Sequence, residues 1–276
     1  LRHIELYDSM TKEIIDKISK RRITLQRIIN YNKVCLYIKR LLVNRFDYFY
    51  PVIPTEYKLI RNWYPQFRLK YINLGFKRSI DFLINTNISD KKYILLGNSA
   101  AYENNHMDIF EIIKRLDLGN FKILMPISYP SNKEYEKYKA RLKDISKEKK
   151  SNIEYLENFM PIDEYSKILE GCISAIMGHH RQQAAGNIYM LLFHGARIFL
   201  YEDNPLYHYL KDNLIGINTI EELKSDPVLI KTELKPSEKN INRQFVIDIY
   251  NGYKNDFELL NELNNRTKNE KNSYIH

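Results

Sequence analysis

The stretch Tyr93-Ile-Leu-Leu-Gly-Asn-Ser99 decides the fold class of this 276-residue chain. An apolar run predicts a short buried strand, and the glycine and asparagine after it predict a turn. Apolar residues then recur with the spacing of one helix face, at Ile109, Ile112, Ile113 and Leu116. A buried strand followed directly by an amphipathic helix is the repeating unit of a parallel α/β sheet.

The same alternation continues toward the C-terminus. Apolar runs predict further strands at residues 122–125, 153–156, 174–177, 197–201 and 215–217. Helical patterns lie between or after these runs, at residues 133–145, 162–169 and 187–193, from Pro205 and from Thr219. Six strands that alternate with helices predict a doubly wound parallel sheet.

Residues 1–88 do not show this alternation. They predict two amphipathic helices within residues 12–45, a short strand within 45–54, and a helix over 55–63 with Thr55 as its cap. The tail beyond residue 236 predicts one or two closing helices. We therefore expect three parts, at residues 1–88, 89–236 and 237–276. Because the first residue is leucine, we expect that the sequence begins inside a longer protein.

Composition and charge exclude several classes of protein. The chain is 44% hydrophobic and 28% charged, which excludes a disordered chain, and its two cysteines are too few for a disulfide scaffold. The net charge is +9, and residues 12–45 alone hold ten basic and two acidic residues. This basic amphipathic segment indicates either packing on a neighbouring domain or contact with an anionic membrane surface. The membrane interpretation predicts contacts from Lys20, Arg21, Arg22 and Arg27.

The loop Gly178-His-His-Arg-Gln-Gln-Ala-Ala-Gly-Asn187 is the strongest candidate site. Six of its ten residues carry polar side chains, although it lies between an apolar strand and an apolar helix. Polar groups in such a place need a ligand or a full set of hydrogen bonds. Arg181 and the N–H groups of a helix start suit a diphosphate, whereas a solvated loop with a helix cap is the plainer alternative. Adjacent histidines diverge and have no evident third partner, so we predict no metal site.

Two other predicted strand ends could contribute to the same site. Gly97-Asn-Ser99 offers a close approach to backbone N–H groups, and Glu202-Asp-Asn-Pro205 offers groups for sugar or ribose hydroxyls. The sequence has no G-x-G-x-x-G and no P-loop motif, which argues against nicotinamide, flavin and P-loop sites. It also has no D-x-D pair, so we expect diphosphate binding without a divalent ion.

An ordered set of motifs resembles glycosyltransferase family 56. The motifs are Ile94–Ser99 with Asn105-His106, Met125–Tyr129, Phe159–Tyr165, Arg181–Gln183 with Gly186, and Glu202–Pro205. The resemblance as a whole covers roughly residues 45 to 220. The resemblance implies a GT-B architecture of two Rossmann-like α/β domains, with the nucleotide-sugar in the C-terminal one. The N-terminal, acceptor-facing domain would be incomplete and helical in this sequence.

The resemblance also implies a function. The protein would be a hexosyltransferase that needs neither a metal nor a cofactor. It would move a deoxyamino sugar from a TDP- or UDP-linked donor to an undecaprenyl-diphosphate-linked saccharide. The enzyme would be peripheral, on the cytoplasmic face of the bacterial inner membrane, in surface polysaccharide synthesis such as that of enterobacterial common antigen. Two alternatives stay open: a non-catalytic module that binds nucleic acid through the basic helices, and another GT-B chemistry such as nucleotide-sugar epimerisation.

The glycosyltransferase interpretation assigns roles to particular residues. Arg181 and His179 are the predicted catalytic residues. The predicted donor-binding residues are Gly97, Asn98, Ser99, His106, Tyr129, Gln182, Gln183, Gly186, Asn187, Glu202 and Asn204. No nucleic-acid partner is expected.

Overall fold

The computed structural model describes residues 8–11, 13, 46, 48–72, 90–148, 152–251 and 261. These residues form two compact units, one with residues 8–13 and 90–244, the other with 46–72 and those from 245 onward. The helices predicted within residues 12–45 and their proposed membrane contacts lie outside the described residues. The assignment of donor and acceptor parts to residues 1–88, 89–236 and 237–276 stays a prediction.

The larger unit contains a six-stranded sheet in which all neighbouring strands are parallel. The strand order is β5-β4-β3-β6-β7-β8. The strands are β3 (Tyr93–Leu96), β4 (Lys122–Pro126), β5 (Ile153–Leu156), β6 (Cys172–Met177), β7 (Arg197–Leu200) and β8 (Asn218–Thr219). The predicted doubly wound sheet is thereby confirmed. We call the boundary between β3 and β6 the sheet reversal, because the chain adds β4 and β5 on one side of it and β6, β7 and β8 on the other. Ligands of such sheets bind beyond the carboxyl ends of the strands at this boundary.

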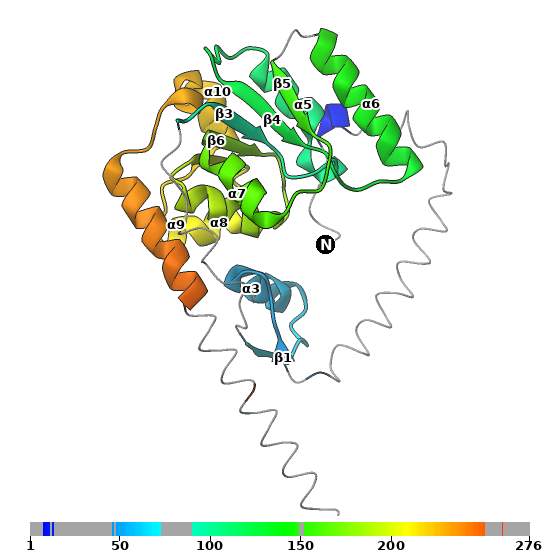
Figure 1. Ribbon diagram of the computed structural model, residues 1–276. Coiled ribbons are helices and arrows are strands. Elements are labelled where there is room, and N and C mark those ends of the chain that lie inside the picture. Colours follow the sequence, from blue (N-terminus) through cyan, green and yellow to red (C-terminus); the bar gives the residue numbers. More distant parts are fainter. Residues whose placement is uncertain are drawn as a thin grey trace, which may run out of the picture. The chain divides into compact units, whose positions relative to one another are not determined.

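Helices cover both faces of the sheet (Figure 1). They are α5 (His106–Ile113), α6 (Lys133–Glu148), α7 (Ile162–Glu170), α8 (Ala185–Phe193), α9 (Pro205–Asp212) and α10 (Ile220–Ser225). Two short 3₁₀ helices, η1 (Tyr102–Asn104) and η2 (Pro227–Lys231), and a helix over residues 236–251 complete the described part.

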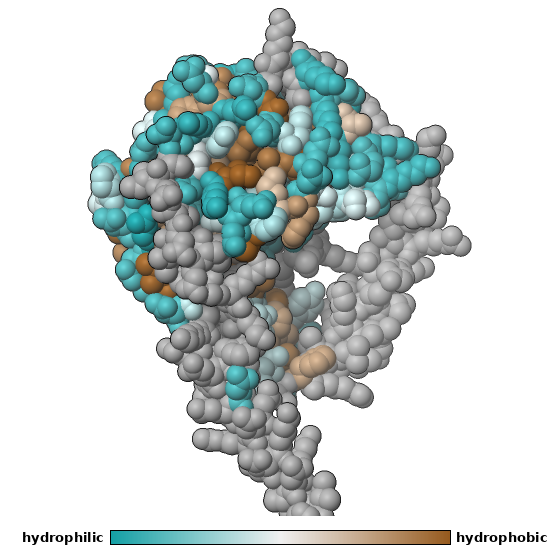
Figure 2. Space-filling view, in the orientation of Figure 1, coloured by the Kyte–Doolittle hydropathy of each residue, from teal (hydrophilic) through white to brown (hydrophobic). Residues whose placement is uncertain are grey.

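The core lies on both faces of the central strands, which explains why these strands are apolar without alternation. Ile94 and Leu96 of β3 belong to one buried cluster with side chains of α5, α6 and α10. Leu95, which is also fully buried, points to the opposite face because successive strand side chains alternate. Each such side chain contributes about 1.5–3 kcal/mol on burial. The outer surface of α6 is largely hydrophilic (Figure 2), as expected for a helix at the edge of the core.

One strand prediction needs a correction. The apolar residues Ile215 and Ile217 predicted the sixth strand, but β8 lies just beyond them, at Asn218–Thr219. The N–H of Ile217 donates to the carbonyl of Ile215, so the chain turns locally there and pairs with β7 only afterwards. The two isoleucines are buried, and their burial produced the misleading pattern.

The smaller unit contains β1 (Tyr48–Phe49), which pairs in parallel with β2 (Lys70–Tyr71), and the helix α3 (Pro54–Trp63). The prediction of Thr55 as the cap was wrong, because the helix begins one residue earlier, at Pro54. The Glu56 carboxylate accepts hydrogen bonds from the N–H groups of Val52 and Ile53 instead. Of the helices that the structure describes, none is long and apolar enough to cross a membrane.

Candidate donor site at the sheet reversal

The turn after β3 and the loop after β6 meet at the sheet reversal. Gly97 has a φ of +67°, and a Cβ there would lie 2.6 Å from Asn104 Oδ1. Gly178 is equally confined, because a Cβ there would lie 2.4 Å from the carbonyl oxygen of Asn104. Both glycines are therefore required by the close approach of η1 to these two strand ends.

Asn104 is the central residue of this contact and is fully buried. Its Oδ1 accepts a hydrogen bond of 3.0 Å from the N–H of Asn98, and its Nδ2 donates to the carbonyl of Ser99 at 3.1 Å. The same Oδ1 lies 2.9 Å from Nε2 of His179. Asn104 thus joins the β3 turn to the β6 loop, although no sequence pattern had marked it as a site residue.

The hydrogen bonds of His179 determine its tautomer. Nε2 faces the side-chain oxygens of Asn104 and Asn98, which only accept, so Nε2 carries the proton. Burial, with a smaller contribution from Arg181, lowers the pKa of His179 to about 3. The ring is therefore neutral near pH 7. His179 is fully buried and helps to hold the loop, and a direct role in the chemistry stays a prediction.

Four other predicted residues lie in or near this contact. Asn98 Oδ1 also accepts from Gln183 Nε2 at 3.1 Å, and Asn98 Nδ2 donates to the hydroxyl of Tyr129 at 3.1 Å. His106 lies deeper, with Nδ1 3.3 Å from the hydroxyl of Tyr138. Burial lowers the pKa of His106 to about 3, so it too is neutral.

Two asparagines hold the backbone of the loop 178–184 from outside. Asn204, at the cap of α9, donates from Nδ2 to the carbonyls of His179 at 2.7 Å and Arg181 at 3.1 Å. Asn105 donates to the carbonyl of Gly178 at 2.7 Å. These three hydrogen bonds from the protein itself give the loop a defined backbone conformation. That preorganisation favours binding, because less freedom is lost when a ligand arrives.

The N-terminus of α8 is the open part of this region. Its cap residue, Ala184, has a φ of +58° and carries a methyl group that offers no acceptor to the first N–H groups. Apart from its chain neighbours and the backbone of α8 itself, no atom of the described residues lies within 4 Å of a Cβ built on Gly186. Asn187 points elsewhere, since its Nδ2 donates to the hydroxyl of Tyr165. An open helix start with backbone N–H groups suits an anion.

Arg181 lies on the same loop and is partly exposed. Its Nη2 is 3.6 Å from Oε1 of Glu103, and Nη1 donates to the carbonyl of Gln182 at 3.3 Å. A pair of this length at the surface contributes little to stability. The guanidinium can therefore turn toward an incoming anion at small cost.

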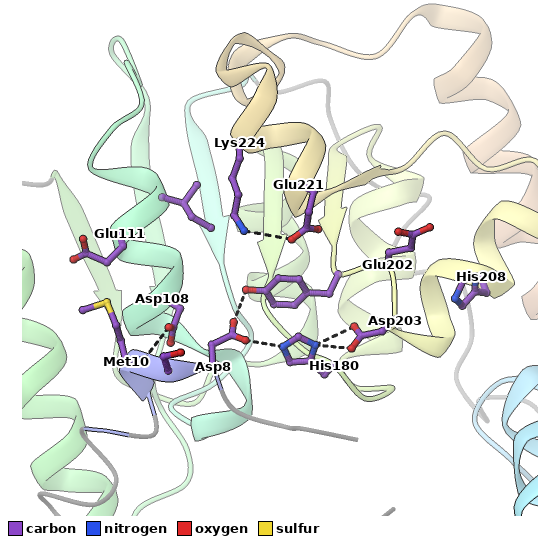
Figure 3. A pocket seen from close by; sticks show the side chains of 13 residues that line it. Asp8, Met10, Asp108, Glu111, His180, Glu202, Asp203, His208, Glu221 and Lys224 are labelled. Atoms are coloured by element: carbon purple, nitrogen blue, oxygen red, sulfur yellow. Dashed lines mark hydrogen bonds and ion pairs between the residues drawn. The ribbon is translucent and has the colours of Figure 1, made fainter. Parts of the chain in front are cut away.

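Beside the loop lies a cavity of about 850 Å³, shown in Figure 3. His180 lines it, with Nδ1 2.9 Å from Asp203 and Nε2 3.0 Å from Asp8. The His180 ring stacks on Tyr201 with 4.2 Å between the centroids. Glu202, predicted to bind the donor, lines the same cavity.

Burial alone would lower the pKa of His180, but the hydrogen bonds and charges of Asp8 and Asp203 outweigh it. The pKa of His180 consequently lies above the ordinary value for histidine. Burial would likewise raise the pKa of Asp8, yet hydrogen bonds from His180 and Tyr201 bring it below the ordinary value. Both shifts favour the ion pair.

Four residues that organise this region were not among the predicted site residues: Asp8, Asn104, Asn105 and Asp203, although Asn105 and Asp203 stood within quoted motifs. Asn104-Asn105 had a signal, as two amides directly before an apolar helix, but the pattern does not say which groups they face. Asp8 had none, because 172 residues separate it from His180. The described residues contain no group of three or more His, Cys, Asp or Glu that could hold a metal ion. Metal independence remains a prediction.

A family model described as 4-alpha-L-fucosyltransferase, glycosyl transferase group 56, matches residues 60–260. The chain belongs to this family. The resemblance drawn from the ordered motifs is thereby confirmed, and with it membership of a glycosyltransferase family.

Solved structures with the same fold agree with this placement. Sucrose-phosphate synthase from Thermosynechococcus elongatus superposes with a TM-score of 0.61 at 11% identity, covering 86% of this chain and 62% of that one. A glycosyltransferase from Rickettsia africae gives 0.57 at 13% identity, covering 83% and 67%. A trehalose-phosphate synthase from Burkholderia xenovorans gives 0.54 at 9%, covering 77% and 61%. These neighbours are GT-B glycosyltransferases, which confirms the predicted GT-B fold. The chain spans about three fifths of the sucrose-phosphate synthase.

Proposed function

We propose that this chain binds a nucleoside-diphosphate sugar at the sheet reversal and transfers the sugar to an acceptor. The observation that carries the proposal is the open start of α8 beside a preorganised loop, 178–184, at the reversal of a parallel sheet. Diphosphates bind at such helix starts because the N–H groups and the helix dipole meet negative charge there. Gly97–Ser99 borders the same place.

Arg181 is the proposed catalytic cation. When the bond between the sugar and the phosphate breaks, extra negative charge develops on the leaving diphosphate. A fixed cation nearby stabilises that transition state more than the ground state. Arg181 suits this role because it can exchange its loose contact with Glu103 for two parallel hydrogen bonds to phosphate oxygens.

The donor and the acceptor are proposed in finer terms as well. We take the sugar to be a deoxyamino hexose on TDP or UDP, and the acceptor to be an undecaprenyl-diphosphate-linked saccharide at the cytoplasmic face of the bacterial inner membrane. The family description as a fucosyltransferase supports a deoxy sugar. The ten basic residues within 12–45 support a peripheral position on an anionic surface.

The donor proposal is tested with thermal shifts in the presence of EDTA, with TDP, UDP, GDP and their sugars. We expect one nucleoside diphosphate to raise the melting temperature of the wild type. The nucleotide-sugar that stabilises the wild type is then used as the donor in a transfer assay. In that assay Arg181→Ala should lose about a hundredfold in turnover, and Arg181→Lys should also be impaired. Arg115→Ala, at an exposed arginine after α5, is the control. No shift with any nucleotide, or normal turnover of Arg181→Ala, contradicts the proposal.

The membrane proposal is tested by sedimentation with phosphatidylglycerol vesicles. Charge reversal at Lys20, Arg21 and Arg22 should weaken binding to the vesicles and leave nucleotide affinity unchanged, since each basic residue near the surface contributes about 1 kcal/mol. Unchanged sedimentation would mean that the segment packs on protein. Tight, steeply salt-dependent binding to a polynucleotide would favour the nucleic-acid alternative.

A further inference from the structure

A short segment from the beginning of the chain, Asp8–Thr11, docks on the larger unit beside the cavity (Figure 3). The N–H of Asp8 donates to Oδ1 of Asn105 at 2.9 Å. The carboxylate of Asp108, in the first turn of α5, accepts from the N–H groups of Met10 and Thr11 at 2.9 and 3.0 Å. It also accepts from the hydroxyl of Thr11 at 2.7 Å. These contacts satisfy the backbone N–H groups of Asp8, Met10 and Thr11 and the hydroxyl of Thr11.

The side chain of Asp8 reaches farther than this docking requires. One carboxylate oxygen faces Nε2 of His180 at 3.0 Å, and the other accepts from the hydroxyl of Tyr201. The opposite nitrogen of His180 faces Asp203, and its ring stacks on Tyr201 with an interplanar angle of 9°. The imidazole is therefore fixed at both nitrogens and on one face.

We infer that Asp8 is a positioning residue of the donor site: through His180 and Asn105 it holds the loop 178–184 in the conformation that meets the diphosphate. The inference rests on the proposed function. Asp8 acts on the loop at two points, since Asn105 accepts from the Asp8 N–H and donates to the carbonyl of Gly178. Arg181 directly follows His180, so any rotation of this part of the backbone displaces the proposed catalytic cation.

A carboxylate is the group that this position needs. Its two oxygens accept from two different donors, and its charge matches a protonated imidazole. In Asp8→Asn one oxygen is replaced by an NH₂ group, which cannot accept, so one of the two hydrogen bonds is lost together with the charge. Asp8→Glu keeps both oxygens on a longer stem and should restore part of the effect.

The pKa of His180 is a measurable quantity that a general loss of stability does not change. The groups that contact its ring are Asp8, Asp203 and Tyr201, and its neighbours in the chain are His179 and Arg181. The cavity that it lines also contains Asp108 and Glu111 of α5, Glu202, His208, and Glu221 with Lys224 of α10. Among all these residues, Asp8 and Asp203 are the two whose side chains contact the imidazole nitrogens of His180. Removal of the Asp8 charge must therefore lower the pKa of His180.

The test uses the full chain with labelled histidines and measures two quantities. Proton–nitrogen NMR follows the titration of His180, assigned by the signal missing in His180→Gln. Calorimetry measures the affinity for TDP or UDP, whichever stabilises the wild type. Asp8→Asn should lower the pKa of His180 and weaken nucleotide binding about tenfold, with partial recovery in Asp8→Glu. Thr11→Val removes a docking hydrogen bond of the same segment without touching His180, and should change both quantities much less.

Several results would overturn the inference. A wild-type His180 that titrates below the ordinary histidine range would show that its contact with Asp8 does not form. Normal nucleotide affinity in Asp8→Asn, despite a shifted titration, would show that the contact does not position the loop. Equal losses in Asp8→Asn and Thr11→Val would reduce the role of Asp8 to docking of the segment. If the wild type binds no nucleotide, the proposed donor site fails instead, while the NMR titration still decides the contact.

Discussion

Two neighbouring histidines of one loop lie in opposite environments. His179 belongs to a buried amide network with Asn98, Ser99 and Asn104, in which every contact is between neutral groups. His180 belongs to a charged cluster with Asp8, Asp203 and Tyr201, on the wall of a cavity. The network joins the two strand ends at the sheet reversal, whereas the cluster joins the loop to distant parts of the chain.

This difference explains how one loop can keep a fixed backbone conformation and still respond to pH and to bound ligands. A neutral buried network keeps the same hydrogen bonds while it stays folded, because its histidine does not ionise near neutral pH. A partly exposed ion pair changes its strength with pH and with bound ligands. We therefore expect the network to determine whether the loop folds, and the cluster to tune how it binds.

Acid should have the largest effect, because it protonates His179 of the network together with the buried His106 and His194. Burial lowers the pKa values of His106 and His179 to about 3 and that of His194 to about 4. Their contribution is fully present above the unfolded pKa of about 6.5 and is lost as pH falls toward the folded values. Denaturant unfolding should lose about 5 kcal/mol between about pH 7.5 and pH 5.

The variant His106→Asn is the control for this pH dependence, because one of the three buried histidines is then replaced by a side chain that does not titrate. Its stability should depend less steeply on pH than that of the wild type over the same range. A stability that stays level down to about pH 5 would mean that these histidines are protonated in the folded protein.

The next effect should come from the glycine between the strand and the two histidines. In Gly178→Ala the new Cβ would lie 2.4 Å from a backbone oxygen of η1, which cannot move without separating the network. We expect a loss of about 3 kcal/mol in the free energy of unfolding. Gly186→Ala, where the space is open, is the matched control and should change stability by less than about 1 kcal/mol. Equal effects of the two would contradict this account of the network.

Much of the fold was predictable because burial on both faces leaves a continuous apolar run. The pattern of β3 was predicted at its observed bounds, Tyr93–Leu96. The stretch 178–187 was singled out because polar residues crowd between apolar elements, and α8 begins within it, at Ala185. The error at Ile215–Ile217 has the same origin. Burial marks a residue as part of the core, but it does not tell whether the backbone pairs or turns.

The partners within the site were much less predictable. Polar density indicated that His179 and His180 need partners, yet only the topology brings η1 and the β6 loop together around Asn104. Asp8 was beyond the reach of local patterns, because its contact depends on how a distant segment docks. The proposed cation, Arg181, was found from its residue type and its place in the polar loop, and its contact with Glu103 was not anticipated.

Removing the charge of Asp203 should have the smallest effect on stability, and it tests whether the charged cluster, unlike the neutral network, weakens as pH rises. Asp203 is 59% exposed in its side chain, so solvent screens its charge, and Asp203→Asn should cost under about 1 kcal/mol. Because the folded pKa of His180 is raised, its contribution is fully present below the unfolded pKa and is lost as pH rises through the folded value. Asp203→Asn should therefore lower stability measurably at about pH 6 and hardly at all at about pH 9, in parallel denaturant titrations. An equal loss at both pH values would mean that Asp203 acts through packing of the turn before α9, and the charged cluster would then reduce to Asp8 and His180.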